Sequence, residues 1–182
     1  MSENHSQLAA QQAQDLAGQL ELLETKTSAQ TRIVLAESCT AGLVCALLGQ
    51  VPGISRFLCG SMVTYRELTK QQWLSVSPET LDQFTAESIE TTKLMATGVL
   101  ERTEEADYSA AITGHLGPLT GDDPPSEKDG KIFVVVAKRD NETISIVSTD
   151  KVQLKSSTRI DRQYESAAAV INALSVGIAS VG

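Results

Sequence analysis

The sequence is poor in the residues from which several kinds of site are built. Only two of its 182 residues are histidines, His5 and His115, and this scarcity argues against a His-based zinc centre. Its three cysteines are Cys39, Cys45 and Cys59, an odd number without the spacing of metal ligands. An odd set of this kind predicts free thiols in a reducing compartment rather than a disulfide framework.

Long apolar runs and an excess of basic residues are also missing. There is no run of 18 apolar residues to predict a membrane span, and no basic segment leading into an apolar core to predict a secretory signal. Lys and Arg number 15 against 23 Asp and Glu, a formal net charge of −8. An acidic surface repels phosphate backbones and anionic membranes at long range, although local donors can still bind a small phosphorylated ligand. We therefore expect a cytoplasmic protein with no nucleic-acid or membrane partner.

Helix-forming and strand-forming segments alternate along the chain. The apolar spacing predicts helices over 6–28, 41–49, 66–74, 86–103 and 158–178, a helical turn after 77–78, and strands over 32–36, 57–65, 107–113, 131–138 and 143–149. This order predicts an α/β protein, a three-layer α/β/α sandwich with a mixed, mostly parallel sheet plus an N-terminal helix. We expect residues 1–28 to form a helical extension and residues 29–182 a single domain.

The segment "AESCTAG" places three potential nucleophiles at the turn between a predicted strand and a predicted helix. Ser38 or Thr40 could simply cap the helix. Alternatively, the free amides of the helix start could bind a phosphate or an oxyanion, with Ser38 as a nucleophile that needs a base. Cys39 is the rival nucleophile, and its only candidate base is His115.

A second polar cluster, "TYRELTK", follows the second predicted strand and contains Tyr65 and Lys70. On a generic surface Lys70 would be a solvated charge. Folded back into a cleft, it would lose part of its solvation, its pKa would fall, and its neutral amine could act as a base. Tyr65 could orient it or relay a proton. A Ser-Lys pair can transfer acyl groups without histidine.

The third cluster, "TGHLGP" at 113–118, contains Thr113, Gly114 and Gly117 at a predicted strand end. Glycines there let backbone amides approach a ligand, but the dinucleotide fingerprint is absent. Because ligands of such sheets sit beyond the carboxyl ends of the parallel strands, we expect the loops 37–42, 65–70 and 113–118 to converge.

Two further groups have a functional and an ordinary interpretation. Asp122, Asp123 and Glu127 lie in the long expected loop 114–130 and could hold a cation, although acidic loops of this kind are commonly only solvated. Arg159 and Arg162 open the last predicted helix and could reach a phosphate, although surface arginines are commoner.

Together, "AESCTAG", "VPGISRFLCGSMVTYRELTK" and "AITGHLGP" resemble the motifs of the CinA C-terminal domain family. Its stand-alone members include the PncC-like nicotinamide-mononucleotide amidohydrolases. The resemblance implies a hydrolase that converts nicotinamide mononucleotide to nicotinate mononucleotide and ammonia, without metal or other cofactor, in pyridine nucleotide salvage. It implies Ser38 as nucleophile, Lys70 as base and Tyr65 as a further catalytic residue. Substrate-binding residues would be Thr40, Ala41, Gly42, Thr113, Gly114 and Gly117, and amides near Ala41 and Gly42 would meet the oxyanion or the phosphate.

The chain departs from the family motifs at several positions. The family's A-E-S-C-T-G-G has Ala41 as its sixth residue here, Glu67 replaces the asparagine of Y-S-N-E-x-K, and His115-Leu116 replaces I-A in T-G-I-A-G-P. These changes keep open an alternative, a catalytically silent or altered-substrate CinA-like paralogue that binds a nucleotide-like ligand. Other family roles concern competence and the damage response. Since related domains associate, a homodimer or higher homo-oligomer is also expected.

Overall fold

The computed structural model describes residues 4–117 and 126–180, and its helices and strands alternate as expected. The helices are α1 (His5–Thr27), α2 (Leu43–Gly49), the 3-10 helix η1 (Ile54–Arg56), α3 (Glu67–Leu74), α4 (Pro78–Phe84), α5 (Ile89–Glu101) and α6 (Arg159–Ala179). The strands are β1 (Ile33–Glu37), β2 (Leu58–Val63), β3 (Tyr108–His115), β4 (Lys131–Asp140) and β5 (Thr143–Gln153). The two candidate cation ligands Asp122 and Asp123 lie outside the described residues.

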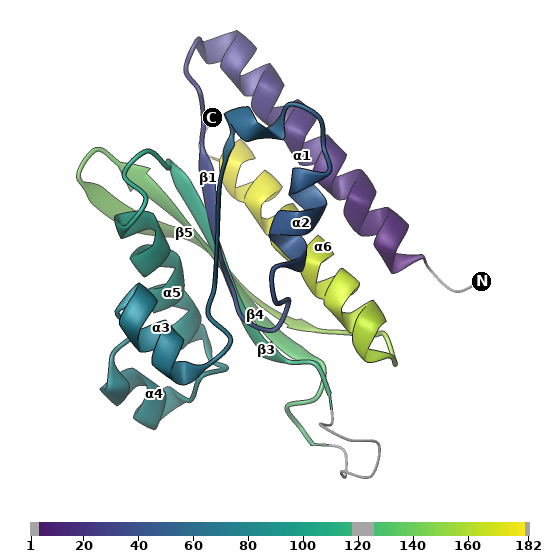
Figure 1. Ribbon diagram of the computed structural model, residues 1–182, viewed down its shortest axis with the longest axis vertical. Helices are drawn as coiled ribbons and strands as arrows, with labels where there is room; N and C mark the ends of the chain where they lie inside the picture. The colour runs from purple at the N-terminus through teal and green to yellow at the C-terminus, as the bar shows by residue number, and fades with distance from the viewer. Residues whose placement is uncertain (1–3, 118–125, 181–182) are drawn as a thin grey trace.

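The five strands form one mixed sheet in the order β2-β1-β3-β4-β5. The pairs β2-β1 and β1-β3 are parallel, whereas β3-β4 and β4-β5 are antiparallel. Figure 1 shows α1, α2 and α6 on one face of this sheet and α3, α4 and α5 on the other. The three-layer α/β/α architecture is therefore confirmed, with the parallel part confined to β2, β1 and β3.

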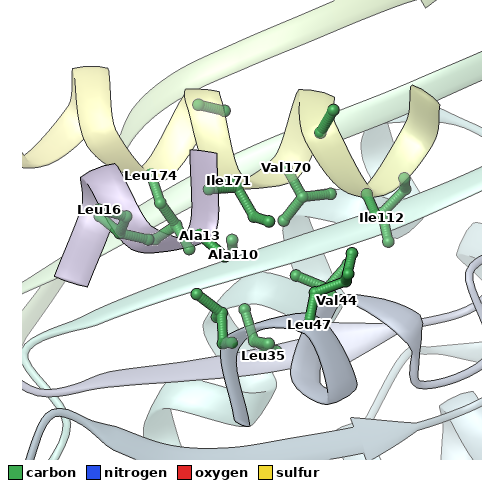
Figure 2. Packing of buried hydrophobic residues seen from close by; sticks show 14 of the residues in the cluster. Ala13, Leu16, Leu35, Val44, Leu47, Ala110, Ile112, Val170, Ile171 and Leu174 are labelled. Atoms are coloured by element: carbon green, nitrogen blue, oxygen red, sulfur yellow. The ribbon is translucent and has the colours of Figure 1, made fainter. Parts of the chain in front are cut away.

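Two apolar layers enclose the sheet because alternate residues of each strand point to opposite faces. On β1, Leu35 belongs to the layer under α1, α2 and α6, whereas Val34 belongs to the layer under α5. Figure 2 shows the first layer, in which Leu16 of α1 and Ile171 of α6 pack together over β1 and β3. Both residues are fully buried, so α1 contributes to the same core as the rest of the sandwich.

Several boundaries differ from the predicted elements; β5, for example, continues to Gln153 rather than ending at residue 149. The third strand continues through Gly114 to His115, because β4 pairs with it up to the register His115↔Lys131. The hairpin between β4 and β5 turns at residues 141–142 alone, since β4 continues to Asp140 and Thr143 already pairs with it. Within the described ranges, no helix combines the length and apolarity that crossing a membrane would require.

Candidate functional site

A pocket of about 420 Å³ lies at the carboxyl ends of the parallel strands. Its walls come from the end of β3 and the loops that follow β1, β2 and β3, together with the segments before α5 and β4 and the first turn of α6. The lining residues are Ser38, Cys39, Tyr65, Glu87, Gly114, His115, Leu116, Gly117, Lys128 and Arg159. The three loops expected from the sequence to converge therefore do so in the structure.

Ser38 and Lys70 are hydrogen-bonded to each other at this pocket. The Lys70 Nζ lies 2.9 Å from the Ser38 Oγ and donates a second hydrogen bond of 2.7 Å to the carbonyl oxygen of Thr64. Ser38 directly follows β1, and Lys70 lies in α3, which begins shortly after the neighbouring strand β2. Parallel pairing of β1 with β2 thus brings together two side chains that are 32 residues apart in the sequence.

The Lys70 side chain is almost completely buried, with 1% of the residue exposed. Burial disfavours the charged ammonium and lowers the pKa of Lys70, an effect that the negative charges of Glu87 and Glu67 partly oppose. None of the described carboxylates forms an ion pair with it. A desolvated amine of this kind has a larger neutral fraction near neutral pH than a solvated lysine, which suits a general base.

The carboxylate of Glu37 is buried beside Ser38 and holds the start of α2. It accepts hydrogen bonds from the backbone amides of Gly42, Val44 and Cys45, all between 3.0 and 3.1 Å, and from the Ser61 hydroxyl. These amides carry the partial positive charge of the helix N-terminus. The positive end of α2 is therefore already neutralised by the protein itself.

The possibility that Ser38 or Thr40 caps α2 is wrong. The N-cap residue is Gly42, which has no side chain to accept a hydrogen bond. The Glu37 carboxylate accepts the hydrogen bonds of the first helix amides instead. The amide of Ala41 donates to the Ser38 carbonyl. The amides near Ala41 and Gly42, which the resemblance assigned to an oxyanion or a phosphate, are thus engaged within the protein. Those of Cys39 and Thr40 donate to no acceptor among the described residues.

Ala41 has a left-handed backbone conformation, with φ of 53°. This conformation strains a residue with a Cβ, whereas glycine adopts it freely. We predict that Ala41→Gly raises the free energy of unfolding by about 1 kcal/mol, after subtracting the greater entropy of glycine in the unfolded chain. Urea unfolding would measure the change. As a matched control, Ala46→Gly at an exposed position within α2 should lower it by about the same amount. A loss of stability in Ala41→Gly would contradict the prediction.

Cys39 lines the pocket but is a poor nucleophile. Burial raises the pKa of its thiol to about 12, although the nearby Lys70 works in the opposite direction. The thiolate is the reactive form, and it is scarce at neutral pH under these conditions. His115 is engaged elsewhere, because its Nδ1 lies 2.9 Å from the Oδ1 of Asp129.

Tyr65 lies at the rim of the pocket with about half of its surface exposed. Its hydroxyl accepts a hydrogen bond of 3.1 Å from the Arg159 guanidinium rather than contacting Lys70. Gly114 and Gly117 line the pocket. A Cβ on Gly114 would come within 2.8 Å of the β4 backbone, and one on Gly117 would meet the guanidinium of Arg162.

The other expected binding residues lie outside the pocket lining. Thr113 is fully buried, and its hydroxyl pairs with that of Thr92 at 2.8 Å. Thr40 is also buried, and its hydroxyl has no hydrogen-bond partner in the described part of the chain. Ala41 is exposed, as is Glu67 in the first turn of α3. The substitutions at Ala41 and Glu67 therefore leave the pocket walls unchanged.

Arg162 holds two loops at the base of the site together. Its guanidinium donates to the carbonyl oxygens of Ser156 and Leu116, at 2.7 and 2.9 Å. The amide of Gly130 closes the same region by donating to the His115 carbonyl. Arg162 is thus a structural link between α6 and the end of β3, whereas Arg159, one turn earlier, faces the pocket.

Sequence reasoning assigned no role to three residues of the site. Glu37 lies within "AESCTAG", and the available signal was a carboxylate just ahead of a helix start, where it can bind free amides. Glu87 precedes α5 and lines the pocket, as does Lys128 ahead of β4. No local pattern marks Glu87 or Lys128, because both reach the site only through the folding of distant segments.

Comparison with known proteins gives consistent results. Residues 15–176 match the model of the CinA C-terminal domain. A CinA-like protein of Leptospira borgpetersenii is 38% identical over 122 residues, which are 67% of this chain and 28% of that protein. A CinA-like protein of Endomicrobium trichonymphae is 42% identical over 106 residues, 58% of this chain and 23% of that protein. The chain thus spans about a quarter of the length of these curated relatives.

Solved structures cover nearly the whole chain. The competence/damage inducible protein CihA of Agrobacterium tumefaciens has 26% identity and a TM-score of 0.77, covering 91% of this chain and 95% of that one. A competence or damage-inducible protein of Enterobacter asburiae has 27% identity and a TM-score of 0.76, covering 92% and 96%. About nine-tenths of the chain is therefore similar in fold to these solved structures.

Proposed function

The chain belongs to the CinA C-terminal domain family, and on that premise we propose that it hydrolyses the carboxamide of nicotinamide mononucleotide, releasing ammonia. One observation carries the proposal, the hydrogen bond of 2.9 Å between the buried Lys70 amine and the Ser38 hydroxyl. A lysine whose pKa is lowered by burial, next to a serine that opens to a pocket, is the arrangement that a Ser-Lys amidase requires.

The proposed reaction begins with neutral Lys70. One of its N–H groups stays on the Thr64 carbonyl, which turns the lone pair toward the Ser38 hydroxyl. Lys70 takes the proton of Ser38 as the Oγ forms a bond to the amide carbon. The tetrahedral intermediate then collapses by breaking its C–N bond, and the Lys70 ammonium gives its proton to the amide nitrogen, which leaves as ammonia. Water attacks the acyl-enzyme by the same route, with Lys70 again accepting a proton, and regenerates Ser38.

The oxyanion of the intermediate needs donors close to Ser38. The amides of Cys39 and Thr40 are our candidates, because they directly follow the nucleophile and have no acceptor among the described residues. The amide of the residue after a serine nucleophile serves in this way in other hydrolases. Those at the start of α2 are excluded, since Glu37 already binds them.

The size and lining of the pocket agree with a small nucleotide amide. A volume of about 420 Å³ is in the range of pockets for small molecules, which begins at about 300 Å³. Its wall contains two cations, Arg159 and Lys128, in a chain whose net charge is −8. The relatives of known structure are named for competence or damage induction, and these names give no substrate.

The alternative is a silent module of the same fold that only binds a nucleotide-like ligand. A silent module would have no need of a buried amine without a carboxylate partner, which costs stability. The substituted residues Ala41 and Glu67 are both exposed and lie outside the pocket lining, whereas His115 and Leu116, which replace I-A of the family motif, line it. The buried amine is therefore the observation that favours the amidohydrolase, and His115 and Leu116 are the positions at which an altered substrate preference would arise.

Ammonia release from nicotinamide mononucleotide tests the proposal. We predict that Ser38→Ala lowers kcat by about 10³-fold or more, since loss of a nucleophile removes the covalent route. Cys39→Ala removes the rival thiol and should retain turnover. Mass spectrometry of the wild type quenched during turnover should detect an acyl group on Ser38. Full turnover in Ser38→Ala, or loss of turnover only in Cys39→Ala, would overturn the assignment, and absence of turnover in the wild type would favour the silent module.

A further inference from the structure

A second, smaller pocket adjoins the one that contains Ser38. It has a volume of about 210 Å³ and is lined by Glu87, His115, Lys128, Lys131, Phe133 and Lys151. Glu87, His115 and Lys128 line both pockets, so the two pockets adjoin at these three residues. Together the two adjoining pockets, here called the cleft, extend from the ends of the parallel strands to residues of the antiparallel strands β4 and β5, at the end of the sheet where β3 finishes.

The register of the sheet gathers the lysines of this second pocket. Lys131 and Phe133 are two residues apart on β4 and point to the same face, and Lys151 of β5 pairs directly with Phe133. Lys128 joins them from the turn that precedes β4. The neighbouring Asp150 pairs with Val134 and therefore points to the opposite face, so it does not neutralise them.

Lys128, Lys131 and Lys151 form a cluster of positive charge on an otherwise acidic protein. None of them forms an ion pair with a carboxylate in the described ranges 4–117 and 126–180. The one carboxylate lining the pocket is Glu87, which stands at the junction with the first pocket. Lysine ammonium groups bind phosphate as point charges, and three of them around one pocket suit a phosphoryl group.

We propose that this second pocket is the phosphate subsite of the enzyme, an inference that rests on the proposed function. The order of groups along the cleft matches the order within a pyridine mononucleotide. The carboxamide lies at Ser38, the ribose hydroxyls donate to Glu87 at the junction, and the 5′-phosphate meets Lys131 and Lys151. In many phosphate sites the amides of a helix N-terminus bind the phosphate. Here Glu37 already occupies the amides of α2, so the phosphate is bound by lysine side chains instead.

An ordinary explanation of the same lysines is protection of a sheet edge. β5 is an edge strand, and lysines on such strands discourage pairing with other chains. That explanation covers Lys151 but not Lys131, which lies on the interior strand β4. It also predicts no difference between ligands with and without a phosphate, so the two explanations can be separated.

The first measurement compares two amides that differ only in the phosphate. In the double variant Lys131→Gln/Lys151→Gln, we expect the ratio of kcat/KM for nicotinamide mononucleotide to that for nicotinamide riboside to fall about tenfold, mainly through KM for the mononucleotide. Lys93→Gln, which removes a single charge from the exposed face of α5, should leave the ratio unchanged. An unchanged ratio in the double variant, or an equal fall in Lys93→Gln, would overturn the subsite.

The second measurement does not depend on catalysis. Inorganic phosphate, titrated into the protein in a calorimeter at low salt, should bind the wild type and Lys93→Gln, and should bind the double variant about tenfold more weakly. If the wild type fails to hydrolyse the mononucleotide, the proposed function is lost, but this titration still decides the subsite. Equal phosphate binding by the wild type and the double variant, or no binding by the wild type, would contradict it.

Discussion

Lys70→Met is expected to abolish amide hydrolysis and to leave the protein at least as stable as the wild type. Methionine fills a similar volume but cannot accept the Ser38 proton, and loss of a general base lowers kcat by about 10²- to 10⁴-fold. Replacing a buried charge with an apolar side chain is neutral or stabilising by about 1 kcal/mol or more. Ammonia release and urea unfolding would measure the two effects. Activity that survives in Lys70→Met, or a large loss of stability without loss of activity, would contradict the role of Lys70 as a base.

The same lysine predicts how activity and stability depend on pH. Because neutral Lys70 is the base and its pKa is lowered by burial, kcat/KM should rise with pH through a value below 10.5, the ordinary pKa of lysine. Between the folded-state pKa and 10.5 the unfolded chain binds more protons than the folded protein, so stability rises with pH there. The stability advantage of Lys70→Met should therefore be full below the folded-state pKa and shrink as the pH approaches 10.5.

Glu37→Gln should be the most destabilising single substitution near the pocket. The buried carboxylate accepts three backbone amides and the Ser61 hydroxyl. One of the two carboxylate oxygens becomes an NH2 group in glutamine, and an NH2 group cannot accept a hydrogen bond. Some of the buried N–H groups are therefore left without an acceptor. Each such group costs about 1–3 kcal/mol, so we expect a loss of about 3 kcal/mol in the free energy of unfolding. Urea unfolding of the variant at neutral pH would measure it.

Glu67→Gln is the matched control for Glu37→Gln. Glu67 also lies at the start of a helix, but it is exposed and water can replace its contacts. We expect little change in its free energy of unfolding. Equal effects of the two substitutions would mean that the helix charge alone, rather than the buried hydrogen bonds, sets the stability of this turn.

The layers of the fold can be predicted from the sequence because local patterns determine them. Strand segments such as 131–138 have a β-branched apolar composition, and α4 begins at the predicted position, with Ser77 as its cap and Pro78 as its first residue. The ends of β3 and β4 are harder to predict, because pairing with β4 extends β3 through His115 and pairing with β5 extends β4 through Asp140. Only the tertiary partner decides such boundaries.

The site can be predicted from the sequence only in part. Ser38 and Lys70 each follow a predicted strand, so their convergence follows from parallel pairing. The burial of Lys70 and the contacts of Glu37 do not follow from local sequence, because they depend on amides and side chains that assemble only in the fold. Nor does the lysine pocket, since Lys131 and Lys151 come together through the antiparallel register of β4 and β5.

The carboxylate of Glu37 has an evolutionary consequence. Because it satisfies the amides of α2 internally, no ligand is needed to keep the turn that carries Ser38 in shape. The lysines that we assign to phosphate lie on a different part of the sheet and share no hydrogen bond with that turn. Mutations among them can therefore change which substrates are accepted while the nucleophile keeps its geometry. Substitutions in the second pocket can therefore change substrate specificity without changing the turn that carries Ser38.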